Sequence, residues 1–312
     1  MFRLSPVVAA LLAGLLVATA APAAPAAAPL PVTEVAPGVF VHAGAVAQTS
    51  PGNRGDIANI GFVVGESAVA VIDSGGSVAV AESALAAIRQ VTDLPVRYLI
   101  NTHMHPDHVF GNQVFAGIGA TIIGHRRLPA ALSARADFYR QSMREQLGAE
   151  LAGAVTITLP DETVEREQRI DLGGRTLLLR AWETAHTDND LTVLDEATGT
   201  LFAGDLLFMQ HVPVLDGSIK GWLAQLPELA ALDAERVVPG HGPPSAPWPQ
   251  ALEAQTAYLE ALAADLRAAI AAGVPIAEAV DGAAAGQAGN WRLFEAYNPR
   301  NATAAFAELE WE

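Results

Sequence analysis

The stretch that most constrains this chain gathers three histidines and one aspartate within six residues, His103-Met104-His105-Pro106-Asp107-His108. It closely follows residues 96–100, which predict a buried strand. A loop at a strand end cannot place four such side chains in a core, whereas neutral imidazole and carboxylate are natural ligands of zinc and similar transition ions. Residues two apart in an extended loop point the same way, so His103 and His105 can hold one ion. Asp107 and His108 lie beyond a proline bend and can face a second ion; the alternative is a surface histidine cluster without a metal.

Three further candidate ligands follow strands that the sequence predicts later in the chain: His186, Asp205 and His241. Each can be structural when taken singly, because a histidine in a loop of Gly and Pro is often a turn residue. Together with the first motif they give seven candidate ligands, enough for two ions. The chain contains no cysteine, which excludes disulfides, thiolate nucleophiles, iron–sulfur clusters and cysteine-containing zinc sites. Any metal must therefore be held by histidine and carboxylate.

The charge balance narrows the range of partners. Lys and Arg number 18 and Asp and Glu number 34, which gives a net charge of −16. Phosphate backbones and anionic lipids are bound by basic surfaces, so we expect no nucleic-acid partner and no electrostatic docking on a membrane. With 51% apolar and 17% charged residues, the 312-residue chain can bury a large core and is not disordered by composition.

The first thirty residues predict a targeting segment rather than part of the fold. Arg3 precedes an apolar run at residues 7–18, which is shorter than the roughly 20 residues that a membrane span needs. Small residues at 18–20 form an A-x-A cleavage pattern, so residues 1–20 are interpreted as a secretory signal peptide and residues 21–30 as an Ala/Pro linker. The expected location is periplasmic or secreted, without a stable membrane anchor. The alternative is a signal segment that remains uncleaved as an anchor.

Strand and helix patterns alternate up to about residue 245, which favours a layered α/β fold over an all-β barrel. Strands are expected at residues 32–42, 59–64, 68–72, 96–100, 120–123, within 163–206 and at 237–238. Helices are expected at residues 78–91, 128–147 and 221–232. Residues 246–312 are rich in Ala with apolar positions at helical spacing, and they predict a helical C-terminal extension.

The motifs resemble, in type and order, those of the metallo-β-lactamase fold superfamily: H-x-H-x-D-H at 103–108, then His186, Gly-Asp at 204–205 and Gly-His-Gly at 240–242. The resemblance covers about residues 32–245. It implies an αββα sandwich with the site at one rim of the two sheets. Residues 31–245 would form the metallo-β-lactamase-fold hydrolase domain, and residues 246–312 would be appended to it.

Carried over position by position, the resemblance implies two metal sites. One ion would be held by three histidines, His103, His105 and His186. The other would be held by Asp107, His108 and His241. Asp205 would bridge both ions. Asp73 matches an acidic residue that orients a ligand histidine from outside the ligand shell. The implied cofactors are two zinc ions, with other divalent transition metals as alternatives.

The same resemblance separates the chain from several branches of the superfamily. Oxygen-reducing di-iron members carry Glu where His105 stands, and some lactamase subclasses need a cysteine near Asp205. The all-histidine lactamase subclass lacks the bridging carboxylate. The glyoxalase II type of thioester hydrolase has both the bridging aspartate and a C-terminal helical extension, and RNA-processing members are usually more basic.

Longer runs are similar to the exported zinc metallohydrolases of the quinoprotein relay system, a branch related to Sox-type hydrolases. These runs lie at residues 101–112, 185–193, 201–208, 211–218, 236–243 and 301–312. The resemblance implies a functional link to periplasmic quinoprotein dehydrogenases and does not specify a substrate.

The mechanism that this resemblance implies is hydrolysis of a small carbonyl compound: an ester, thioester or lactone. The two ions would lower the pKa of bound water from 15.7 to about 7, and the metal-bound hydroxide would attack the carbonyl group, oriented by Asp107 as the catalytic residue. Neither a G-x-S-x-G elbow nor a cysteine competes as the nucleophile. The alternatives are a β-lactamase-like drug hydrolase and a non-catalytic, metal-binding accessory protein of the quinoprotein system.

Other polar residues are candidates for contacts to the substrate or to the ligands. His211 follows Asp205 by six residues and can reach the rim, and His125 ends a predicted strand near the mouth of the site. Asp216 is a weaker candidate, because Asp-Gly is first a turn signal. Five arginines lie in or next to the expected helix at 128–147: Arg126, Arg127, Arg135, Arg140 and Arg144. They form either a solvated face or a lid that attracts an anionic substrate.

Overall fold

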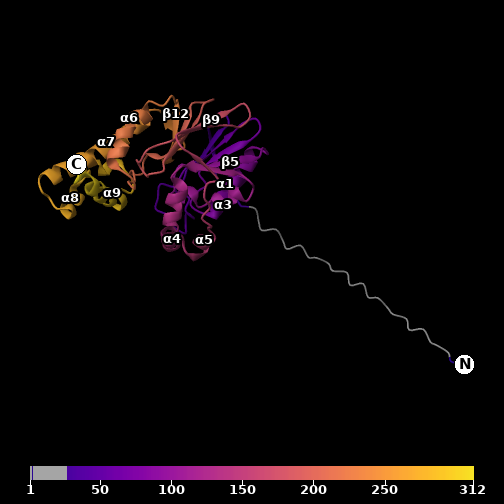
Figure 1. Ribbon diagram of the computed structural model, residues 1–312, viewed down its shortest axis with the longest axis horizontal. Helices are drawn as coiled ribbons and strands as arrows, with labels where there is room; N and C mark the ends of the chain where they lie inside the picture. The colour runs from indigo at the N-terminus through magenta and orange to yellow at the C-terminus, as the bar shows by residue number, and fades with distance from the viewer. Residues whose placement is uncertain (1, 3–26) are drawn as a thin grey trace.

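Two β-sheets lie face to face at the centre of the computed structural model, which describes residue 2 and residues 27–312 (Figure 1). Apolar side chains from both sheets fill the space between them, for example Val41 and Ile100 from the first and Leu179 and Val193 from the second. Helices pack on the outer face of each sheet. The predicted αββα sandwich followed by C-terminal helices is therefore confirmed. The predicted signal peptide, apart from residue 2, and the predicted linker up to residue 26 lie outside the described residues.

The first sheet contains seven strands in chain order. β1 to β4 pair antiparallel and β4 to β7 pair parallel. The strands are Thr33–Ala36 (β1), Val39–His42 (β2), Ile60–Val64 (β3), Val69–Ile72 (β4), Val96–Ile100 (β5), Thr121–His125 (β6) and Glu162–Val164 (β7). β4 and β5 end side by side at Ile72 and Ile100, so the residues after both strands lie at one edge of the sheet.

The second sheet contains six strands in the order β13-β12-β11-β10-β9-β8. Its strands are Glu167–Asp171 (β8), Thr176–Ala181 (β9), Leu191–Asp195 (β10), Thr200–Phe208 (β11), Arg236–His241 (β12) and Ala246–Pro247 (β13). Only β11 and β12 pair parallel within this sheet as described. Ligands often bind at the carboxyl ends of parallel strands, and each sheet brings such ends to the site.

Two capped helices cover the sheets. α1 (Val78–Val91) begins after Ser77, whose Oγ accepts a hydrogen bond from the Val80 N–H at 3.2 Å, and packs on the first sheet. α6 (Ile219–Ala230) begins after Ser218, whose Oγ accepts a hydrogen bond from the Gly221 N–H at 2.8 Å, and packs on the second sheet. The cap at Ser218 explains why this helix starts two residues before the predicted range.

Further helices lie near the site and in the C-terminal region. Beside the first sheet are α2 (Pro106–Val109), α3 (Asn112–Ala116), α4 (Leu128–Leu147) and α5 (Ala149–Gly153). The C-terminal group contains the 3₁₀ segments Gln250–Leu252 and Ala285–Asn290 with α7 (Glu253–Ala271), α8 (Ile276–Gly282) and α9 (Phe294–Leu309). Figure 1 shows α7, α8 and α9 together beside α6, and their apolar side chains join one cluster with the second sheet.

Some elements differ from the sequence-based expectation. α4 has the predicted bounds, but the short helices α2, α3 and α5 were not predicted because they contain too few residues to show a period. Asp205 lies inside β11 and His241 ends β12, whereas both were expected in loops after strands. The reason is that Gly204 adopts φ 53°, which interrupts the register with β12 while the strand continues to Phe208. No helix in the described part of the chain is both long and apolar enough to cross a membrane.

Candidate metal centre

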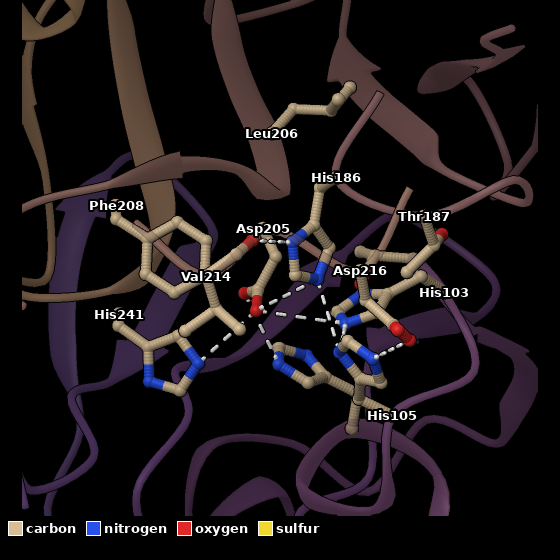
Figure 2. A network of polar contacts seen from close by, with 12 residues as sticks. His103, His105, His186, Thr187, Asp205, Leu206, Phe208, Val214, Asp216 and His241 are labelled. Atoms are coloured by element: carbon tan, nitrogen blue, oxygen red, sulfur yellow. Dashed lines mark hydrogen bonds and ion pairs between the residues drawn. The ribbon is translucent and has the colours of Figure 1, made fainter. Parts of the chain in front are cut away.

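Ligand-type side chains from separate segments converge at one edge of the two sheets (Figure 2). They form two groups, one of His103, His105, His186 and Asp205 and one of Asp107, His108 and His241. The potential ligand atoms of each group lie within 4.8 Å of one another. The fold thus brings together all seven residues that the sequence predicts to be ligands.

His105 stands at the centre of the first group. Its Nδ1 lies 3.1 Å from Nε2 of His103 and 3.1 Å from Nε2 of His186. Nitrogen lone pairs at this separation repel one another unless a proton or a cation lies between them. Burial lowers the pKa of His103 well below its ordinary value and lowers the pKa of His186 to about 4, so these rings are neutral. A metal cation is therefore the natural occupant of this point.

The second group combines one carboxylate with two imidazoles. Oδ2 of Asp107 lies 3.4 Å from Nε2 of His241 and 3.7 Å from Nε2 of His108. Burial opposes a charge on His108, but the surrounding carboxylates, led by Asp205 and Asp107, outweigh it and raise the pKa of His108 well above its ordinary value. The surroundings therefore favour a positive charge at this point.

Asp205 lies between the two groups. Its Oδ2 is 3.4 Å from Nε2 of His186 in the first group and 3.4 Å from Nε2 of His241 in the second, and its Oδ1 is 3.3 Å from Nε2 of His108. Burial alone would raise its pKa, but the neighbouring imidazoles of His241 and His108 hold the pKa of Asp205 well below its ordinary value. A buried anion therefore touches both groups.

Two glycines allow close packing around this carboxylate, one next to Thr102 and one next to Asp205 itself. Gly204 adopts a left-handed conformation, and a Cβ at this position would overlap the side chain of Thr102. A Cβ at Gly240, on the neighbouring strand β12, would overlap Oδ1 of Asp205. The Gly-Asp and Gly-His-Gly patterns thus have a physical role, because they let β11 and β12 approach the site closely.

Each of the five histidines uses one ring nitrogen to fix its orientation and leaves the other for the site. The anchors are Thr102 Oγ1 for His103 (3.0 Å), Asp216 Oδ2 for His105 (3.1 Å), Asp73 Oδ2 for His108 (2.8 Å), the Val214 carbonyl for His186 (2.6 Å) and the Ile57 carbonyl for His241 (2.8 Å). A ring that donates its only proton outward presents a lone pair inward, which is the form that binds a metal ion.

The residues present fit a pair of divalent metal ions. Nε2 of His108 and Oδ1 of Asp205 are buried and lie 3.3 Å apart, but neither forms a hydrogen bond of adequate geometry among the residues that the structure describes. Buried polar atoms are otherwise nearly always paired, so these two atoms call for a partner that the protein does not supply. Imidazole nitrogen and carboxylate oxygen suit zinc and similar ions, which would supply it.

Asp73 follows β4 in a left-handed conformation with φ 61°. Its Oδ2 accepts hydrogen bonds from Nδ1 of His108 at 2.8 Å and from Oγ1 of Thr102 at 2.7 Å, and its Oδ1 accepts one from the Thr102 N–H at 2.8 Å. Thr102 in turn accepts the Nδ1 proton of His103. Asp73 therefore orients one histidine directly and a second through Thr102.

A cavity of about 400 Å³ opens beside the two groups. Its lining includes ligand atoms of both groups, residues of α4 and α9, and the loop between β11 and α6. Among the five clustered arginines, Arg135 lines this cavity, and its Nη1 lies 2.6 Å from Oδ2 of Asp216. Arg126 and Arg127 instead face Glu183, and Arg140 faces Asp137. The basic helix therefore borders the cavity through one arginine that already has a partner.

His211 and His125 occupy different surroundings. His211 lines the cavity, and its Nδ1 donates a hydrogen bond to the Val212 carbonyl at 2.6 Å. Burial and the adjacent His241 lower the pKa of His211 to about 4, so the ring is neutral. His125 is buried at the end of β6, where Nε2 donates to the Trp182 carbonyl at 3.1 Å and Nδ1 accepts from the Arg127 N–H. Both nitrogens of His125 thus serve the scaffold, and its side chain is not part of the cavity lining.

Asp216, which the sequence marks mainly as a turn residue, orients the candidate ligand His105. Its Oδ2 accepts a hydrogen bond from Nε2 of His105 and also pairs with Arg135. Burial opposes its ionisation, but the hydrogen bond from His105 outweighs this and lowers the pKa of Asp216. Asp216 stands 111 residues after its histidine, so no local pattern in the sequence could have connected the two.

Comparisons with known proteins agree with this fold. The sequence model of the Metallo-beta-lactamase superfamily matches residues 53–241. The chain is 26% identical over 190 residues to the Beta-lactamase-like protein 2 homolog of Caenorhabditis elegans. That alignment covers 58% of this chain and 55% of the relative, so the chain spans about half the length of the curated relative that it matches.

Two solved structures share the fold at low sequence identity. A metallo-beta-lactamase from Pontibacter korlensis superposes with a TM-score of 0.60 and 20% identity, covering 74% of this chain and 99% of that one. The stereoselective inverting sec-alkylsulfatase Pisa1 from Pseudomonas sp. superposes with a TM-score of 0.67 and 14% identity, covering 89% of this chain and 50% of that one. At these identities the likeness concerns the fold.

Proposed function

The chain belongs to the metallo-β-lactamase superfamily, and on that premise we propose that it is an exported hydrolase with a binuclear zinc centre that acts on an ester, thioester or lactone. The observation that carries the proposal is the position of Asp205, an anionic and buried carboxylate within 3.4 Å of imidazole nitrogens from both ligand groups. A single carboxylate shared by two groups of imidazoles suits a pair of divalent ions, which bind histidine in its neutral form.

The residues have distinct roles in this proposal. His103, His105 and His186 would hold one ion, Asp107, His108 and His241 would hold the other, and Asp205 would contribute to both. When bound, the ions supply a water nucleophile that is ionised near neutral pH and polarise the carbonyl group of the substrate. Asp107, whose side chain is 18% exposed and lines the cavity, orients the attacking water as the catalytic residue.

His211 and the lining of the cavity bear on the substrate. Because Nδ1 of His211 donates to Val212, its Nε2 is a hydrogen-bond acceptor, which suits a hydroxyl or amide group of a small molecule. A volume of about 400 Å³ fits a small molecule rather than a polymer. The proposed partners therefore include a small-molecule substrate and no nucleic acid.

The proposed setting is the periplasm or the exterior, after cleavage of residues 1–20. It is supported by the signal-like sequence at residues 1–20 and by the runs similar to the quinoprotein relay branch, which also support a functional link to quinoprotein dehydrogenases. Mass spectrometry of the protein recovered from periplasm tests this: the expected N-terminus lies between about residues 19 and 30. Full-length protein that keeps Met1 would contradict export by cleavage.

The activity is tested with zinc-loaded protein and a panel of carbonyl substrates. The expected result is turnover of a thioester, ester or lactone that a chelator abolishes and that zinc restores. The panel also contains β-lactams, because drug hydrolysis is the alternative activity. It further contains a secondary alkyl sulfate, because one structural neighbour is a sec-alkylsulfatase. Two bound zinc ions without turnover of any class would favour the non-catalytic accessory protein instead.

A further inference from the structure

We infer that Asn301 on α9 is a positioning residue for the ligand His186, acting through the carbonyl group of Val214. The inference rests on the proposed metal-binding role of His186. Oδ1 of Asn301 accepts a hydrogen bond from the Leu215 N–H at 2.9 Å, and its Nδ2 donates one to the Pro213 carbonyl at 2.6 Å. The residue between them, Val214, has its carbonyl 2.6 Å from Nδ1 of His186. The Asn301 side chain thus forms hydrogen bonds to the residues on both sides of Val214, whose carbonyl orients His186.

Asn301 is itself held in place. The residue is 1% exposed, and its Nδ2 also donates to the hydroxyl of Tyr258 at 2.8 Å. That hydroxyl donates to Oδ1 of Asn298 at 2.9 Å, and Nδ2 of Asn298 donates to the Ala283 carbonyl at 2.9 Å. These hydrogen-bonding groups are buried, so leaving one of them unpaired would cost free energy. The orientation of Asn301 is set by its direct bonds to Leu215, Pro213 and Tyr258, whereas Asn298 bonds only to the Tyr258 hydroxyl and the Ala283 carbonyl.

The loop held by Asn301 is fixed at its other contacts as well. The Asp216 N–H donates to the His186 carbonyl at 3.0 Å, and the Ser218 N–H donates to the Ala185 carbonyl at 2.9 Å. Glu308, seven residues after Asn301 on the same face of α9, accepts hydrogen bonds from Ser218 Oγ at 2.5 Å and from the next backbone N–H at 2.8 Å. The loop therefore lies between the His186 segment on one side and α9 on the other.

These contacts fix the orientation of the His186 ring. The centroid of its ring lies 5.6 Å from that of Trp222 and 5.5 Å from that of Phe208, and this packing limits the tilt of the ring. The Val214 carbonyl fixes which nitrogen carries the proton and so turns Nε2 towards His105 and Asp205 (Figure 2). Loss of such an outer partner typically weakens metal binding by about 10- to 100-fold. The C-terminal extension is thus a working part of the metal centre.

The test compares zinc binding and folding in Asn301→Ala and Asn298→Ala. Both variants remove buried hydrogen bonds around Tyr258, but only Asn301 touches the loop that carries Val214. Chelator competition with Zn²⁺ should show one of two ions bound about 10- to 100-fold more weakly in Asn301→Ala and both bound normally in Asn298→Ala. The absorption spectrum of the Co²⁺-substituted protein should change in Asn301→Ala alone, although both variants melt at a lower temperature.

Several outcomes separate the possibilities. If Asn301→Ala melts lower but keeps the zinc affinities and the Co²⁺ spectrum of the wild type, the positioning role is overturned and the proposed function stands. If the wild type itself binds no zinc, the proposed metal centre fails and the inference fails with it. Should Asn301→Ala not fold, Asn301→Asp keeps the oxygen that accepts from Leu215 but replaces the donor to Pro213. Weakened binding of one ion in that variant supports the role, and unchanged binding of both overturns it.

Discussion

The carboxylate of Asp73 accepts a hydrogen bond from Nδ1 of His108 at 2.8 Å, at the point where β4 and β5 end side by side. His108, in α2, is therefore oriented by a residue that directly follows β4, and the direction of the Nε2 that would face a metal ion depends on that contact. We expect Asp73→Asn to keep the fold, because Asn tolerates the left-handed conformation at this position. The amide would offer one acceptor oxygen in place of two, so one zinc ion should bind about 10-fold more weakly.

Chelator competition measures this change directly. Asp56→Asn is a matched control, since Asp56 also pairs with a histidine, His42, outside the two ligand groups. Equal zinc affinity in Asp73→Asn and the wild type would show that His108 does not need its carboxylate partner.

A second prediction separates the two contacts of Asp216. Asp216→Asn weakens the acceptor for Nε2 of His105 and should lower both the affinity for one zinc ion and the hydrolytic rate by about 10-fold. Arg135→Gln removes only the partner on α4, and partly exposed ion pairs contribute at most about 1 kcal/mol, so zinc binding should hardly change. Isothermal titration with zinc compares the variants. An equal loss in both would mean that the ion pair, and not the histidine contact, matters.

The residues that converge at the candidate metal centre could be predicted from the sequence, because the residue types that bind metals are recognisable by themselves. Three histidines and an aspartate within six residues cannot be buried without partners, and the strand pattern before them predicts where they lie. The fold class followed from alternating strand and helix patterns and from the order of the motifs. α4 was predicted at its observed bounds because twenty residues show a clear period.

The supporting contacts could not be predicted in the same way. Asn301 meets the Pro213 carbonyl across 88 residues, and His241 meets the Ile57 carbonyl across 184 residues. Such pairs depend on the packing of whole layers, and the residue types involved carry no signal of their own. The position of Asp205 inside β11 also escaped prediction, because the turn of the backbone at Gly204 does not end the strand.

A third prediction concerns removal of the metal. The two groups place histidines together with the carboxylates of Asp107 and Asp205, and ions that bind only the folded state stabilise it by mass action. Zinc at 100 times its dissociation constant would add about 2.7 kcal/mol per site to the free energy of unfolding. Thermal denaturation with and without chelator should therefore show a clear drop in the melting temperature, reversed by added zinc. Identical melting curves in chelator and in zinc would contradict metal binding to the folded protein.

A fourth prediction uses the ion pair of His42 with Asp56, whose atoms lie 2.8 Å apart. Burial opposes the charged imidazole, but the hydrogen bond and charge of Asp56 outweigh it and raise the pKa of His42. A raised pKa in the folded state means that the stabilisation is fully present below the unfolded pKa of about 6.5 and is lost as pH rises through the folded pKa.

Urea unfolding of the wild type and His42→Gln at pH 5.5 and pH 8.5 checks this sign. The variant should lose more stability relative to the wild type at the lower pH, because only there does the charged pair contribute fully. A larger loss at pH 8.5 would contradict the role of Asp56. Since His42 is outside both ligand groups, zinc affinity should be the same in both proteins.

If Asp205 is shared by two metal ions, the metal content per chain should depend on its carboxylate. Two divalent ions repel each other, and among the seven candidate ligands only Asp107 and Asp205 would be anionic with the histidines neutral, as metal binding requires. Asp205→Ser keeps a small polar side chain but removes half of that charge. Elemental analysis of the purified variant should fall from about two zinc ions per chain to about one, with hydrolysis strongly reduced. An Asp205→Ser protein that still carries two tightly bound zinc ions and full activity would show that Asp205 is not shared by two ions.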